Sequence, residues 1–232
     1  ALSGWSIVAT QSRGGMVAVL VSGLVLVVVG GRWRWRVLGT VSAVGLAAIT
    51  YVEVLAAPDV RQRILSVLSA GNDAASSSDA SAGRTDIWAV GLKAFEAHPA
   101  AGSGLGDFTA VTPRYVFHAG LVRRTDFMFV TPKVAHNLYL HLLVEVGVIG
   151  LAIFSLILVA SLIAAWTAVR RFALQGRRDL ELLARATFAS TIGLLVASFF
   201  LSSMFARILW VGLALGPVLA HAARTPDAQG EP

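Results

Sequence analysis

Long apolar segments with few or no charged residues constrain this 232-residue chain more than any other feature. A helix needs about 20 apolar residues to cross the roughly 30 Å hydrocarbon core of a bilayer. Within lipid, a spanning segment must satisfy its own backbone hydrogen bonds, which a helix does. The segments of this kind are residues 14–31, 37–57, 138–169, 186–206 and 208–223. We therefore predict an all-α, polytopic transmembrane helix bundle with about five spans.

The composition of the chain supports this class. Hydrophobic residues make up 56% of it and charged residues 14%, whereas soluble domains contain about 45–50% and about 25%. These values exclude a disordered chain, a coiled coil and an ordinary soluble domain. The chain has no cysteine, which excludes disulfide bonds and thiolate metal sites. The net charge of +6 comes from basic residues between the apolar segments, so we attribute it to membrane topology and predict no nucleic-acid partner.

Two arginine-rich loops predict how the chain is oriented. The motif R-W-R-W-R at residues 32–36 and the segment 170–185 both carry several arginines. Short loops rich in Lys and Arg stay in the cytoplasm, so we predict that the N-terminus lies outside and the C-terminus inside. The segment 58–136 then lies outside, because segments of this length cross the membrane largely regardless of their charge.

The predicted organisation has four parts. They are two transmembrane helices (residues 1–57), an extracytoplasmic catalytic loop (58–136), three transmembrane helices (137–223) and a cytoplasmic tail (224–232).

The long outer loop contains the features that face water. Residues 84–98 form an amphipathic pattern in which Trp88, Leu92 and Phe95 recur at helical spacing. A glycine-rich turn follows at residues 102–108. Loops of this length are usually functional, so we predict short helices around the functional site here.

Five polar residues are candidates for chemistry. Arg13 precedes two glycines, which allow a ligand to approach closely, although an arginine there also suits an interfacial anchor. Arg84 opens the amphipathic pattern, as a ligand-binding group or as a solvated residue at a helix end. His136 enters the third span, as a structural hydrogen-bonding residue or as a base near pH 7. His141 and Glu145 share a helix face, and we predict that they join helices or partner an arginine.

Other kinds of site have little support. The aspartates of the loop form no D-x-D or similar cluster of the kind that binds Mg²⁺, so we predict no metal and no cofactor. The glycine-rich turn lacks the Gly-Lys-Ser/Thr ending of a Walker loop, and the chain has no G-x-S-x-G elbow. Arginines and a histidine on the outer face suit a diphosphate leaving group and a hydroxyl nucleophile.

Five short motifs follow one another between about residues 5 and 165. They are Ser12-Arg13-Gly14, Gly83-Arg84-x-x-x-Trp88, His98-Pro99 with Gly102-x-Gly104-x-Gly106-x-Phe108, His136-Asn137-x-Tyr139-Leu140, and Glu145-x-Gly147-x-x-Gly150. In this order they resemble the O-antigen ligase family of bacterial polytopic membrane proteins. That family includes related O-antigen polymerases and pilin glycan ligases. Its members have longer chains with more spans, so the resemblance suggests the C-terminal portion of such a protein.

The resemblance implies a GT-C-type glycosyltransferase that needs neither a metal nor a nucleotide sugar. Such an enzyme would move a glycan from an undecaprenyl-diphosphate carrier to an acceptor hydroxyl, with inversion, on the periplasmic face of the bacterial inner membrane. In the ligases the acceptor is lipid A–core. Arg13 and Arg84 match the family's functional arginines, and His136 matches its proposed catalytic histidine. The substrate-binding residues that we expect beside them are Asn137, Tyr139, Trp88, Arg123 and Arg124.

Two alternatives stay open at this point. A polymerase or a pilin glycan ligase would use similar chemistry, and the motifs around Arg84 and His136 favour the ligases. A non-enzymatic transporter or scaffold would also be apolar, but transporters commonly carry inverted repeats and interrupted midplane helices. The first three predicted spans show neither feature.

Overall fold

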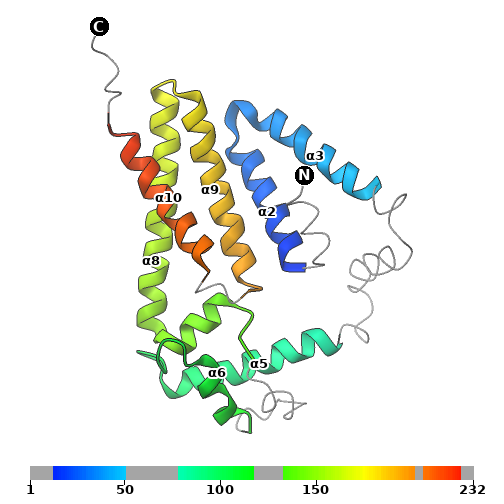
Figure 1. Ribbon diagram of the computed structural model, residues 1–232, viewed down its shortest axis with the longest axis vertical. Helices are drawn as coiled ribbons and strands as arrows, with labels where there is room; N and C mark the ends of the chain where they lie inside the picture. The colour runs from blue at the N-terminus through cyan, green and yellow to red at the C-terminus, as the bar shows by residue number, and fades with distance from the viewer. Residues whose placement is uncertain (1–12, 51–77, 118–132, 202–205, 226–232) are drawn as a thin grey trace. The chain divides into compact units, whose positions relative to one another are not determined.

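The computed structural model describes residues 13–50, 78–117, 133–201 and 206–225, and in these residues it contains helices and turns but no strand. The all-α class is therefore confirmed for this part of the chain. The helices are α2 (Arg13–Val29), η1 (Gly31–Trp33), α3 (Arg34–Thr50), α5 (Ser78–Ala97), α6 (Phe108–Val111), η3 (Thr112–Tyr115), α8 (Leu138–Leu174), α9 (Arg178–Ser198) and α10 (Arg207–Ala222) (Figure 1).

Two of these helices are long and apolar enough to cross a bilayer. α8 has 37 residues and α9 has 21, with mean hydropathies of 2.8 and 1.5 over their most apolar windows. Residues Val19–Val29 of α2 and the whole of α10 are apolar but shorter. Length and composition alone support these spans, and the count of five spans stays a prediction.

The chain divides into two compact units. The first unit contains α5, α6, η3, the first part of α8 and the turn that follows α9. The second contains most of α2, η1, the rest of α8, nearly all of α9 and α10.

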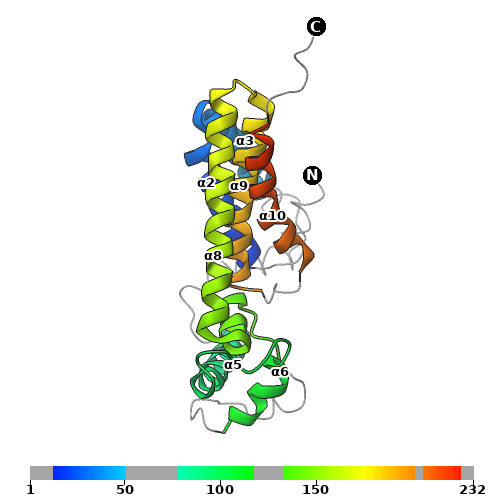
Figure 2. The same ribbon diagram turned by 90° about the vertical axis from the view of Figure 1, so that its left-hand side faces the viewer.

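In the first unit, α5 and α6 pack beside the start of α8 (Figure 2). Ile87, Val90 and Ala94 form the buried face of α5, and they pack in one cluster with Phe108 of α6 and Val144 of α8. The predicted amphipathic helix therefore exists, but its buried face is rotated from the prediction, because Leu92 is 48% exposed. Ile87, Val90 and Ala94 also recur at helical spacing. The sequence alone therefore does not show whether this face or the predicted face with Leu92 is buried.

α8 is interrupted near its start by a loop that inserts into its hydrogen-bond ladder. In a regular helix, Val148 N–H and Ile149 N–H would donate to the carbonyls of Val144 and Glu145, four residues earlier. Here these two N–H groups donate to the carbonyls of residues 99 and 100, at 2.9 and 3.2 Å. The freed carbonyls of Val144 and Glu145 accept from the N–H groups of residues 103 and 104, both at 2.9 Å. The loop thus replaces both missing bonds of the helix, and no backbone group among these is left without a partner.

Two glycines allow this insertion. Gly147 has φ +64° at the break, and Gly102 has φ +73° in the loop. A Cβ at Gly147 would overlap the carbonyl of Ala100, and a Cβ at Gly102 would overlap the backbone of Glu145. The two backbones can meet this closely only where both lack a side chain.

The second unit places the later part of α8 beside α9 and α10 (Figure 1). Its core cluster includes Phe172 of α8, Ala184 of α9 and Leu219 of α10. Pro217 inside α10 has no N–H, so the carbonyl of Leu213 loses its helical donor. The hydroxyl of Ser161 on α8 donates to that carbonyl instead, at 2.6 Å. The hydroxyl of Ser161 thereby replaces the donor that the proline lacks.

The two arginine-rich loops meet at one end of this unit. Arg32 of η1 and Arg185 of α9 both bind the carboxylate of Glu181, at 2.6 and 2.8 Å. Glu181 is only 3% exposed, and Arg185 also donates to the carbonyl of Val29 at the end of α2. These contacts place both loops on the same side of the second unit.

The bounds of the fourth predicted span are wrong. We expected residues 186–206, but α9 starts at Arg178 and ends at Ser198. Its charged first turns are helical because Asp179 and Glu181 suit the positive end of the helix dipole and because Glu181 is paired.

Replacing Gly147 with alanine should lower the stability of the protein. Backbone strain at a positive φ alone should remove about 1–3 kcal/mol of unfolding free energy, and the overlap with the carbonyl of Ala100 adds to this. The unfolding midpoint in detergent measures the loss. Gly45→Ala is the matched control, because Gly45 lies in α3 and a Cβ added there would meet nothing within 4 Å. Equal midpoints for the two variants would contradict the role of Gly147.

Candidate functional site

A side-chain hydrogen bond in the first unit joins α5 to the segment that leads into α8. The indole Nε1–H of Trp88 donates to the carbonyl of Ala135 at 2.8 Å. Arg84 lies four residues before Trp88, on the same face of α5. His136 directly follows Ala135. The bond therefore brings together the surroundings of Arg84 and His136, which are 52 positions apart in the sequence (136 minus 84).

His136 has an unusual backbone conformation. Its φ is +46°, and among the described residues it is the one non-glycine residue with a positive φ. This left-handed conformation costs about 1–2 kcal/mol for a residue with a side chain. Strain of this kind is concentrated at functional sites. The fold thus holds His136 in a conformation that local preferences disfavour.

Asn137 fixes the start of α8 directly after this residue. Its Oδ1 accepts hydrogen bonds from the backbone N–H groups of Tyr139 and Leu140, at 3.0 and 3.1 Å. An asparagine in this position caps a helix and typically stabilises it by about 1 kcal/mol. Asn137 is buried, so these hydrogen bonds give it a structural role, and its contact with substrate stays a prediction.

The surroundings of His136 favour its neutral form. Partial burial lowers the pKa of the imidazole below its ordinary value of 6.5, and the positive charges of Arg84 and Lys133 lower this pKa further. A His136 with a lowered pKa is unprotonated at neutral pH and can accept a proton. The positive charge of Arg84 thus acts on His136, in addition to the hydrogen bond from Trp88 to Ala135 that joins their surroundings.

A group of aromatic rings lies beside Arg84 and His136. The ring of Phe199, in the turn after α9, lies 5.8 Å from the ring of Trp88 and 6.4 Å from that of Tyr139. Sequence motifs indicated Trp88 and Tyr139 but not Phe199. Its signal was hidden because Phe199 lies inside the apolar segment 186–206, in which an aromatic residue resembles any lipid-facing one.

The buried pair His141 and Glu145 does not belong to this group. The ring Nε2 of His141 and the carboxylate Oε1 of Glu145 lie 2.8 Å apart, and the same oxygen accepts from the backbone N–H of Phe108 at 3.1 Å. The carboxylate therefore holds the start of α6 against α8. This agrees with the predicted role of joining helices, through a histidine and a backbone N–H rather than through an arginine.

The other predicted residues are described incompletely or not at all. Arg13 is the first residue of α2, but its side chain is outside the described part of the structure. Arg123 and Arg124 lie outside the described residues. Within the described ranges, no group of three or more His, Asp or Glu side chains could hold a metal ion.

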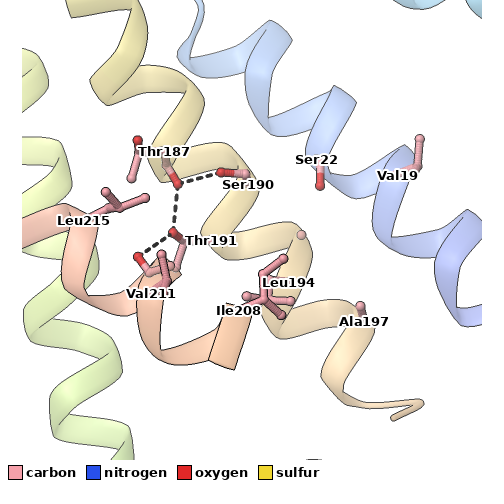
Figure 3. A pocket seen from close by; sticks show the side chains of 12 residues that line it. Val19, Ser22, Thr187, Ser190, Thr191, Leu194, Ala197, Ile208, Val211 and Leu215 are labelled. Atoms are coloured by element: carbon pink, nitrogen blue, oxygen red, sulfur yellow. Dashed lines mark hydrogen bonds between the residues drawn. The ribbon is translucent and has the colours of Figure 1, made fainter. Parts of the chain in front are cut away.

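The second unit has an apolar cavity of about 370 Å³ between α2, α9 and α10 (Figure 3). Hydroxyl groups of α9 line it, but they are used internally: Ser190 and Thr191 donate to the carbonyl of Thr187, at 3.1 and 2.8 Å. The lining includes no titratable side chain. This cavity is therefore not a place for acid–base chemistry, and the group around Arg84 and His136 is the candidate active site.

A comparison with known protein families gives a match over more than half of the chain. A family model described as O-Antigen ligase matches residues 1–155. The match covers α5, α6, η3, the interrupted start of α8 and the surroundings of Arg84 and His136, and it ends before α9. A comparison with curated proteins finds no match. The resemblance expected from the five motifs is confirmed.

Removing a nearby positive charge should raise the pKa of His136 toward 6.5. We expect Arg84→Met to raise it more than Lys133→Met, following the order of their effects on the imidazole. Titration of the histidine ring protons by NMR in detergent micelles measures both changes. Lys93→Met is the control, since Lys93 pairs with Glu96 on the exposed side of α5 and should leave the titration unaltered. A pKa that is the same in all variants would refute the electrostatic coupling.

Proposed function

Because the chain belongs to the O-antigen ligase family, we propose that it is a membrane glycosyltransferase of lipopolysaccharide biosynthesis with its active site at Arg84 and His136. The donor is a glycan on an undecaprenyl-diphosphate carrier, and the acceptor is a sugar hydroxyl of lipid A–core. The observation that carries this proposal is the hydrogen bond from Trp88 to Ala135, which joins the helix of Arg84 to the strained residue His136.

The reaction is an inverting displacement at the anomeric carbon. The imidazole of His136 takes the proton of the acceptor hydroxyl while the acceptor oxygen forms the new bond to the anomeric carbon. The bond from that carbon to the diphosphate oxygen breaks, and its electron pair leaves with the diphosphate. The lowered pKa of His136 supports the role of base, because the ring is neutral before it takes the proton.

Arginine side chains neutralise the leaving group. A guanidinium forms two parallel hydrogen bonds to phosphate oxygens and stays charged at every physiological pH. Arg84 is exposed beside His136 and is available for this role. Arg13 contributes in the same way, and Arg123 and Arg124 bind substrate. Charge stabilisation of this kind is often the largest part of catalysis, which makes a metal ion unnecessary.

The proposed topology has five spans in a GT-C-type arrangement, with the active site on the periplasmic side of the inner membrane. The meeting of the two arginine-rich loops at Glu181 supports this topology, since the positive-inside rule requires both loops on one side. Residues 1–57 and 137–223 form the spans, residues 58–136 the periplasmic loop, and residues 224–232 the cytoplasmic tail.

A polymerase or a pilin glycan ligase is the second candidate, because its chemistry at Arg84 and His136 would be the same. The identity of the product distinguishes these enzymes: one glycan on lipid A–core, one glycan on pilin, or an extended chain of repeat units.

His136→Asn should abolish glycan transfer and preserve the fold. Asparagine tolerates the left-handed backbone conformation of His136, but it cannot accept the proton. Loss of the base should lower the rate by about 10²–10⁴-fold, measured as product formed in membranes that contain the protein and its lipid-linked donor. His221→Asn, at an exposed histidine of α10 that belongs to none of the five motifs, is the control. Unchanged transfer at normal protein levels would remove His136 from the mechanism.

Arg84→Lys should also lower transfer sharply. Lysine keeps the positive charge but loses the planar fork that binds two phosphate oxygens at once. The expected signature is a decrease in kcat, because charge on the diphosphate develops mainly in the transition state. Wild-type kinetics in this variant would show that Arg84 acts only as a distant charge.

A further inference from the structure

The turn after α9 presents an aromatic ring that the core of the first unit does not use. Phe199 is 44% exposed, and it is absent from the buried cluster of this unit. The preceding residue, Ser198, is fully buried. Phe199 is therefore held in place by its neighbours while part of its ring remains open.

Besides the neighbouring Phe200, two aromatic partners of this ring place it at the candidate active site. Its ring lies nearly perpendicular to that of Trp88, at an interplanar angle of 84°, and Trp88 also binds the carbonyl next to His136. Its second partner is Tyr139, three residues after His136. Phe199 thus packs against both elements that supply the reacting groups, α5 with Arg84 and the start of α8 after His136.

A ring in this place suits one class of ligand. A pyranose has a flat face of C–H groups and an edge of hydroxyl groups. The face of an aromatic ring carries negative charge density, which attracts the slightly positive C–H groups. A sugar that stacks on Phe199 through its C–H face would keep its hydroxyl edge free for polar groups nearby.

We propose that Phe199 is a sugar-positioning residue, whose exposed ring face stacks on a pyranose of the donor or the acceptor during transfer. This inference rests on the proposed function, and it adds a contact from the turn after α9, outside the part of the chain that the family model matches. Phe199 does not touch a reacting atom in this role. It orients the sugar for the groups that do.

The competing role for Phe199 is that of an anchor at the membrane interface, where aromatic residues are common. The two roles predict different results. Loss of an anchor would lower the stability or the amount of the protein in the membrane, whereas loss of a stacking platform would raise the KM for a sugar substrate.

The test compares Phe199→Leu, which keeps apolar volume without a ring, with Phe199→Tyr, which keeps the ring. We expect Phe199→Leu to raise the KM for a sugar substrate by about three- to tenfold, the effect of losing one aromatic contact, and Phe199→Tyr to restore it. A rise confined to the donor or to the acceptor identifies the sugar that stacks. Trp35→Leu, at an exposed tryptophan of the second unit, is the control and should leave both KM values unchanged.

A binding measurement separates this inference from the proposed function. Saturation-transfer NMR with free core oligosaccharide and with free repeat-unit oligosaccharide reports sugar contact without turnover. Binding that Phe199→Leu abolishes and Phe199→Tyr keeps would support the inference even if the wild-type protein transferred no glycan. Wild-type KM values and unchanged binding in a folded Phe199→Leu variant would overturn it and would leave the proposed function intact.

Discussion

The first unit depends on an exchange of four backbone hydrogen bonds between α8 and the loop before α6. Val148 and Ile149 give their N–H groups to the loop, and Val144 and Glu145 accept N–H groups from it. A helix that loses two consecutive bonds in an apolar environment would expose polar groups at a cost of several kcal/mol. The loop removes that cost. It also fixes α5 and α6 against α8, and this packing holds Arg84 near His136.

The same requirement explains two contacts in the second unit. Ser161 supplies a donor to the carbonyl that Pro217 leaves without one. Arg185 supplies a donor to the carbonyl of Val29 at the end of α2, while Glu181 neutralises its charge. In each case a polar side chain from a neighbouring helix satisfies a backbone group that its own helix cannot. These polar contacts fix how particular helices pair, which uniform apolar surfaces would leave undetermined.

Local patterns predicted the helices well and their partners poorly. The apolar runs predicted α8 and the helical class, and the glycine-rich turn and Gly147 both stand out as motifs. Their insertion into each other was not predicted, because it joins backbones more than 40 positions apart (147 minus 102) and only the folded chain shows which carbonyls lose their donors. The predicted start of α9 was too late, since its charged turns look like a loop until Glu181 is seen with its arginines. For the candidate site, single motifs indicated Arg84 and His136, whereas Phe199 belongs to it only through packing.

The left-handed backbone of His136 limits which residues can occupy this position of the proposed active site. Few residue types adopt this conformation readily, chiefly glycine, asparagine and aspartate, and histidine is among the tolerated ones. A lysine or a glutamate could not replace the proposed base there without added strain. The start of α8, which Asn137 caps, directly follows His136. It restricts small backbone movements that would shift the imidazole ring. If His136 is the base, as proposed, a change of acceptor substrate would have to arise in the surrounding side chains, because the position of the base stays the same.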